Sequence, residues 1–139
     1  MTTAPTLRSL AGMLDIEISW GRGTHLAAER LHFVRDGVPI FVFANPVFHG
    51  RYDALSPLDI PSLWDARVRV ELDGISVLVT PLEWELLLAV VLSATARVEA
   101  LRTCLQDSYD GRMLTRLLRE GRVQPSTEDA VWAVLESDA

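Results

Sequence analysis

The sequence contains no lysine, so all 13 of its strongly basic residues are arginines. Without lysine, Schiff-base chemistry and a phosphate-binding P-loop are both excluded. The single cysteine, Cys104, can form neither an internal disulfide nor a cysteine-rich zinc site. Because Leu101 and Leu105 lie close to it at helical spacing, we expect a buried thiol and not a catalytic nucleophile.

Long apolar runs are also missing. The longest candidate, Leu86 to Leu92, is far shorter than the ~20 residues that a membrane-spanning helix needs. The N-terminal segment MTTAPTLRSLAG lacks the basic start and apolar core of a secretory signal. We therefore expect a cytoplasmic protein that has no membrane partner.

The composition favours a single domain over residues 1–139, because a 49% hydrophobic chain of this length can bury a substantial core. A net charge of −6 argues against a nucleic-acid partner, since such binding depends on neutralising phosphates. The exception to the acidic balance is a group of arginines at helical spacing, Arg112, Arg116 and Arg119. We interpret them as the solvated face of a helix.

Two segments carry the signature of a β-hairpin. Asp36-Gly37 and Asp73-Gly74 each separate two arms that are rich in β-branched and aromatic residues. Asp-Gly at this position favours a type I′ turn, which needs positive φ at both central residues. In the second hairpin, Val68, Val70 and Leu72 alternate with charged residues, which predicts one solvated face.

Helical patterns follow the second hairpin. Thr80-Pro81 with Glu83 three residues after the threonine resembles a capping box, and the helix behind it is apolar on nearly every side. Further helices are expected over ARVEALRTCLQD, over DGRMLTRLLREG ending at Gly121, and after Ser126. A short helix is expected around Pro61 to Trp64, in an otherwise irregular connector.

The pattern therefore predicts an α+β fold, with two β-hairpins forming a mainly antiparallel sheet packed against a C-terminal set of about four helices. The strand part would cover about residues 13–80 and the helical part about residues 81–137.

A pair of carboxylates, Asp15 and Glu17, is the first candidate site. The run MLDIEISWGRG reads as a strand, so residues two apart would project from the same face. Two such carboxylates could bind Mg²⁺ through oxygen ligands and take part in catalysis on a phosphate-bearing substrate. The alternative is the solvated face of an ordinary strand.

Two loops supply the remaining candidates. His49 in the connector could act as a base oriented by Asp53, with Arg51 beside it as a substrate-binding residue. In WGRGTH, Arg22 and Thr24 could bind a phosphate if the turn leads into a helix N-terminus. A plain turn and a plain surface histidine are the alternatives.

The segment LWDARVRVELDGISVLVTPLEWELLLAVVLSATA, residues 63–96, resembles a segment of uncharacterised members of the nucleotidyltransferase superfamily. The likeness lies in the hairpin followed by Thr80-Pro81-Leu82-Glu83, which opens a buried helix. Upstream, LDIEISW is similar to the strand that carries that family's third acidic position, which corresponds to Asp15 or Glu17. The family's catalytic signature, a Gly-Ser pair followed by Asp-x-Asp, does not occur in this sequence.

The resemblance implies a truncated, nucleotidyltransferase-like domain that has lost the primary metal ligands and serves as a non-catalytic binding or accessory subunit. A missing half would leave an open sheet edge and an uncovered apolar surface, so we expect a protein partner or a homodimer. One alternative is a small metal-dependent enzyme that acts through Asp15 and Glu17, with Mg²⁺ as the candidate cofactor, on a nucleotide or another phosphate-bearing substrate. Another is an antitoxin-like or regulatory protein that binds a partner through its helical half.

Overall fold

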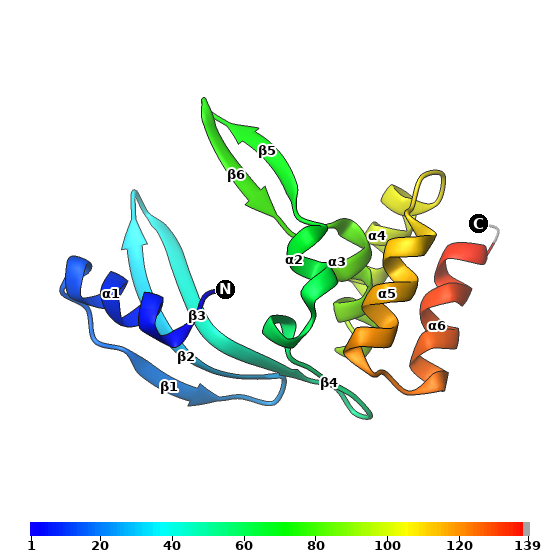
Figure 1. The fold of residues 1–139 in the computed structure, drawn as a ribbon, viewed down its shortest axis with the longest axis horizontal. Helices are drawn as coiled ribbons and strands as arrows, with labels where there is room; N and C mark the ends of the chain where they lie inside the picture. The colour runs from blue at the N-terminus through cyan, green and yellow to red at the C-terminus, as the bar shows by residue number, and fades with distance from the viewer. Residues whose placement is uncertain (138–139) are drawn as a thin grey trace.

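The computed structural model describes residues 1–137 and has the predicted α+β class (Figure 1). A four-stranded antiparallel sheet has the order β1-β2-β3-β4, and a separate two-stranded sheet consists of β5 and β6. The N-terminal elements are α1 (Ala4–Leu14), β1 (Ser19–Arg22), β2 (Leu26–Arg35), β3 (Val38–His49) and β4 (Ala54–Leu55). The remaining elements are η1 (Pro57–Asp59), α2 (Pro61–Asp65), β5 (Val68–Leu72), β6 (Ile75–Val79), α3 (Leu82–Val91), α4 (Thr95–Leu105), α5 (Gly111–Gly121) and α6 (Pro125–Glu136).

Both predicted hairpins are confirmed. The φ angles are 52° and 77° at Asp36 and Gly37, and 49° and 77° at Asp73 and Gly74. Positive φ at both central residues is the mark of the type I′ turn that Asp-Gly favours. The hairpins do not pair with each other: β2–β3 forms the centre of the larger sheet, whereas β5–β6 stands alone and projects from the molecule (Figure 1).

The prediction of a strand beginning at Met13 is wrong. Residues 4–14 form helix α1, which buries Leu7 and Ala11 against Leu31 and Ala44 of the sheet. The helix ends at Asp15, whose left-handed φ of 53° lets its N–H reach the carbonyls of the last turn. The chain therefore begins with a helix and not with strands, because the period of the apolar residues before Asp15 is helical.

The C-terminal helices surround α3, which is buried on most sides as expected. Its start differs from the prediction: Pro81 is the N-cap residue, and Thr80 donates from Oγ1 to Glu85 Oε1 at 2.6 Å. Helix α6 begins at Pro125 and Ser126 does not cap it. The predicted burial of Cys104 is also wrong, because its thiol lies on the exposed side of α4.

Helix α5 has the expected faces. Leu114, Leu117 and Leu118 are buried, whereas the three arginines of the predicted solvated face are exposed. The residue with left-handed φ at its end is Arg122, one position after Gly121. Glu120 accepts hydrogen bonds from Ser62 Oγ at 2.7 Å and from Ser62 N at 2.9 Å, which ties α5 to α2.

Two separate apolar clusters hold the molecule together. The smaller one lies between α1 and the four-stranded sheet. The larger one fills the helical half and also includes Leu55, Ile60 and Leu63 of the connector. Phe48, near the end of β3, packs against this larger cluster, so β3 reaches from one cluster to the other.

The connector after β3 joins the sheet to the helices by hydrogen bonds as well. One oxygen of Asp53 accepts from the backbone N of Gln124 at 2.7 Å, and the other accepts from the hydroxyl of Thr127. A carboxylate in this position caps the N-terminus of α6, where it also complements the helix dipole.

Candidate functional site

The turn between β1 and β2 lies beside the end of β3. The N–H of Gly23 donates to the carbonyl of Leu26 at 2.8 Å and closes the turn. The N–H of His49 donates to the carbonyl of His25 at 2.8 Å, and His25 Nδ1 lies 3.1 Å from the carbonyl oxygen of His49. WGRGTH is thus a strand-to-strand turn, and the predicted helix N-terminus behind Thr24 does not exist.

Three of the predicted site residues line one hollow, which we call the His49 hollow. Thr24, His49 and Arg51 lie around it with His25, and the end of α3 with the following Leu92 and Ser93 forms the opposite wall. Its volume of ≈ 270 Å³ lies below the range of about 300–1,000 Å³ that is usual for small-molecule sites. The guanidinium of Arg51 lies over the ring of Tyr52, 5.2 Å from its centroid.

Gly50 is required where β3 ends against α3. A Cβ at this position would lie 2.1 Å from the carbonyl oxygen of Val91, closer than real Cβ atoms approach. The two backbones therefore meet directly, which brings the sheet and the helical half together at the His49 hollow. Any side chain at residue 50 would force them apart.

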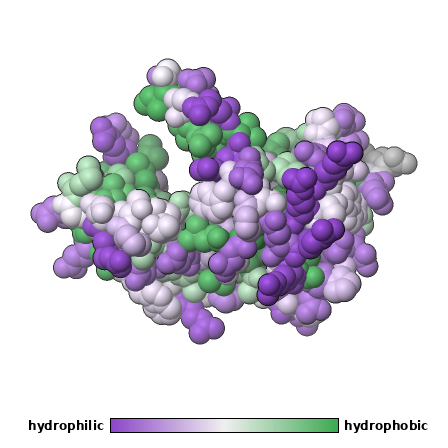
Figure 2. Space-filling model, in the orientation of Figure 1, coloured by the Kyte–Doolittle hydropathy of each residue, from purple (hydrophilic) through white to green (hydrophobic). Residues whose placement is uncertain are grey.

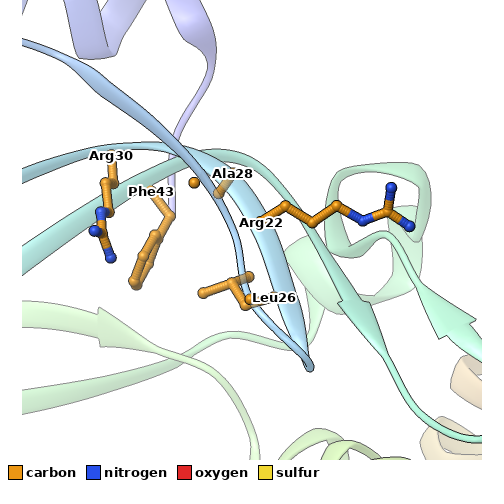
Figure 3. Close-up of a pocket in the computed structure, with 7 residues that line it drawn as sticks. Arg22, Leu26, Ala28, Arg30 and Phe43 are labelled. Carbon is orange, nitrogen blue, oxygen red and sulfur yellow. The ribbon is translucent and has the colours of Figure 1, made fainter.

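Arg22 lies at a second hollow of ≈ 290 Å³, which we call the Arg22 hollow and which is lined by β1, β2, the turn between them and Phe43 of β3. Figure 3 shows Arg30 and Phe43 side by side, with Leu26 near them, whereas the side chain of Arg22 extends away from this group. Arg30 Nε donates to Ser19 Oγ at 3.4 Å. The predicted substrate-binding residues are therefore divided between two shallow hollows.

Asp15 and Glu17 line neither hollow. Both are exposed, in the segment between α1 and β1, while Ile16 and Ile18 turn toward the smaller apolar cluster. The expected alternation is present, but on an extended segment outside any strand. Among residues 1–137, no three His, Cys, Asp or Glu side chains come together in a way that could hold a metal ion.

The structure gives Asp53 a different partner from the predicted one. Its two carboxylate oxygens are occupied by Gln124 and Thr127, as described above. Asp53 therefore acts as the cap of α6 and not as the group that orients His49.

The β5–β6 hairpin carries an exposed apolar surface. The register pairs Val68 with Val79, Val70 with Val77 and Leu72 with Ile75, so six aliphatic side chains share one face. None of the six is buried, and Leu72 and Ile75 are 56% and 66% exposed. We call this surface the aliphatic face; Figure 2 shows hydrophobic residues along the projecting hairpin.

The aliphatic face continues into a groove at the base of the hairpin. Val68, Val70 and Val79 form one wall of this groove, and α3, α4 and α5 contribute the other. Its volume is ≈ 450 Å³, and its lining is mostly apolar. The residues from the helices and their flanking turns are Thr80, Pro81, Leu82, Glu83, Cys104, Leu105, Ser108 and Met113.

Comparison of the sequence with protein-family models and with curated proteins, and of the fold with solved structures, gave no match. The resemblance to the nucleotidyltransferase superfamily therefore depends on the residues quoted above alone. No helix within residues 1–137 has both the length and the apolar character needed to cross a membrane.

Sequence reasoning missed His25, Arg30 and Phe43 as neighbours of the predicted site residues. They become neighbours through the β1–β2–β3 register, for which the sequence of β1 carries only a weak signal. The aliphatic face could have been found: Ile75, Val77 and Val79 repeat at period two directly after an Asp-Gly turn. The exposure of this face could not be predicted, because the tertiary fold decides whether another element covers the hairpin.

Proposed function

We propose that this protein is a non-catalytic binding module, an accessory subunit that presents the β5–β6 hairpin to a protein partner. The observation that carries the proposal is the aliphatic face, because a contiguous apolar surface on a projecting element is typical of an interaction site. The adjoining groove extends this surface onto the helical half. A partner strand or helix laid along the hairpin would cover both.

The resemblance to the nucleotidyltransferase superfamily forms part of this proposal. The Thr80-Pro81-Leu82-Glu83 junction stands at the base of the hairpin, and the sequence lacks the Gly-Ser/Asp-x-Asp signature. Nucleotidyl transfer depends on metals held by such carboxylates. Asp15 and Glu17 are exposed and lie outside both hollows, which supports a domain that retains the scaffold for binding without catalysis.

The test compares partner binding by the natural protein and by the double variant Ile75→Ser/Val77→Ser. A partner recovered from cells should be purified and titrated against both proteins by isothermal calorimetry. We expect the double variant to lose at least about tenfold in affinity, because two apolar contacts at an interface are removed. Equal affinities would overturn the proposed role of the aliphatic face.

The matched control is Val34→Ser/Val38→Ser, which changes exposed valines at the tip of the other hairpin. This control should bind the partner as the natural protein does. Circular dichroism of all three proteins would establish that the substitutions leave the fold unchanged.

A second function, binding of a phosphate-bearing small molecule, is favoured by the convergence of Thr24, His49 and Arg51 on the His49 hollow. Thermal-shift titrations with inorganic phosphate and with ATP, CTP, GTP or UTP, each with and without Mg²⁺, would detect it. Stabilisation that is lost in Arg51→Ala would support this function. Stabilisation lost only in Asp15→Ala/Glu17→Ala would instead favour the metal-dependent enzyme.

A further inference from the structure

The outer edge of β5 is unpaired within the part of the chain that the structure describes, because its sheet contains only β5 and β6. The two-residue turn makes Leu72 and Ile75 the hydrogen-bonded pair that closes the hairpin. Hydrogen-bonded and non-hydrogen-bonded positions alternate along an antiparallel strand. The N–H and C=O groups of Arg69 and Glu71 therefore point outward, toward the free edge.

The charges along β5 are arranged symmetrically around Val70. Arg67 and Arg69 precede it, and Glu71 and Asp73 follow it. When two copies of β5 lie antiparallel with Val70 opposite Val70, Arg69 of each copy faces Glu71 of the other. Arg67 and Asp73 lie just outside the strand, and Arg67 donates from Nε to the carbonyl of Trp64 at 2.8 Å.

Hydrogen bonding and charge select the same register. Arg69 opposite Glu71 joins two residues whose backbone groups both point outward, as an antiparallel hydrogen-bonded pair requires. The two nearest registers with the correct hydrogen-bonding parity place Arg69 against Arg69, or Glu71 against Glu71. Like charges directly opposite each other destabilise a sheet. The alignment on Val70 is thus specified by β5 itself.

We propose that β5 is the dimerisation edge of this protein, and that it pairs antiparallel with β5 of a second copy. The result is a four-stranded sheet with the order β6-β5-β5-β6 and an isologous interface. This inference rests on the proposed function and deepens it: a two-fold axis perpendicular to the sheet puts both aliphatic faces on the same side. The dimer then offers a partner a doubled apolar surface.

The other exposed edges lack this complementarity. The strand β6 reads Ile-Ser-Val-Leu-Val and contains no charge that could select a register. The strand β1 has four residues and places Gly21 within them, and β4 has two residues. Of these edges, only β5 combines an outward backbone with a self-complementary charge pattern.

The test uses charge reversal across the predicted pair, with sedimentation equilibrium at low ionic strength as the measurement. Arg69→Glu alone places two acidic residues opposite each other at two symmetry-related positions, and Glu71→Arg alone does the same with arginines. We expect each single variant to dimerise about tenfold more weakly than the natural protein. The double variant Arg69→Glu/Glu71→Arg should dimerise like the natural protein.

An equimolar mixture of the two single variants gives a second readout. In a heterodimer of Arg69→Glu with Glu71→Arg, every opposite pair has unlike charges, so the mixture should form more dimer than either variant alone. Arg69 also donates from its Nη1 to Ser76 Oγ at 2.6 Å within its own hairpin. Ser76→Ala removes that hydrogen bond without changing charge, and it should leave the dimer intact.

The proposal is overturned if the natural protein is a monomer up to about 100 µM, or if both single variants dimerise with unchanged affinity. The failure of this inference is distinguishable from a failure of the proposed function. The charge variants leave all six residues of the aliphatic face in place, whereas Ile75→Ser/Val77→Ser leaves the charges in place. A monomer that still binds a partner through Ile75 and Val77 would refute the dimer alone.

Discussion

The two hairpins of this protein have the same turn and different surroundings. Both turn on Asp-Gly with nearly identical positive φ angles. The β2–β3 hairpin has arms of ten and twelve residues, is flanked by β1 and β4, and is covered on one face by α1. The β5–β6 hairpin has arms of five residues, and its aliphatic face is open. The residues of the turn are thus enough to specify a hairpin, whereas the elements that bury its apolar face come from elsewhere in the chain.

This difference sets how each hairpin is stabilised. The first contributes Leu31 and Ala44 to a buried cluster, so its loss would expose α1 as well. The second touches the rest of the molecule mainly at its base, where α2 is tied to α5 by Ser62 and Glu120. We therefore expect the first hairpin to unfold together with the smaller cluster, and the second to open locally.

The largest effect is expected from Leu31→Ala in the covered hairpin. Leu31 is fully buried between the sheet and α1, so truncation should cost about 2–5 kcal/mol through lost burial and a cavity. The comparison variant is Leu72→Ala in the open hairpin, where the cost should be about 0.5 kcal/mol or less. Urea unfolding of both variants measures the difference. Similar costs would mean that Leu72 is covered in solution.

An intermediate effect is expected from alanine in the two turns. Gly37→Ala and Gly74→Ala each place a Cβ at φ 77°, which should cost about 1–2 kcal/mol locally. For Gly37 the cost should appear in global stability. For Gly74 it should appear as faster amide hydrogen exchange confined to the β5–β6 hairpin, with the melting temperature nearly unchanged. Exchange that stays the same in Gly74→Ala would contradict local opening.

A smaller, pH-dependent effect is expected at the base of the open hairpin. The hydrogen bonds from Ser62 Oγ and Ser62 N lower the pKa of the Glu120 carboxyl below its ordinary value of 4.5. A lowered pKa in the folded state contributes stability above the unfolded pKa, and this contribution is lost as the pH falls through the folded value. Glu120→Gln should therefore be less stable than the natural protein at neutral pH.

The difference in stability between Glu120→Gln and the natural protein should narrow as the pH falls below 4.5. Thermal unfolding of both proteins across this pH range measures the difference. Ser62→Ala removes the largest cause of the pKa shift and should change the pH dependence in the same direction. Parallel stability curves for Glu120→Gln and the natural protein would contradict this role for Glu120.

Local patterns predicted the parts of the fold that depend on neighbours in sequence. The Asp-Gly turns, the short helix at Pro61 and the buried helix after Pro81 are all present. Helix α1 was missed, because the alternation of Asp15 to Ile18 was extended backward over a helical pattern. The prediction that Cys104 is buried is wrong because helical spacing identifies residues that share one side of a helix, but not which side the other helices cover.

The candidate site was predicted less well than the fold. His49, Arg51 and Thr24 meet at one hollow, although they come from the end of β3 and from the distant β1–β2 turn. Asp15 and Glu17 remain outside it, because the end of α1 redirects the chain. Residues meet across strands only through register, and register is set by the whole sheet. Patterns within single segments could not supply it.

The cap that Asp53 provides for α6 also has a consequence for the order of folding. The carboxylate is 71 residues before Gln124 and 74 residues before Thr127. During synthesis the four-stranded sheet can therefore form before the cap has a partner. Helix α6 can pack Val131 and Leu135 against the other helices, but its N-terminus gains the cap only once the loop from Asp53 to Thr127 has closed. The contact between the start of the connector and the N-terminus of α6 should therefore be among the last to form.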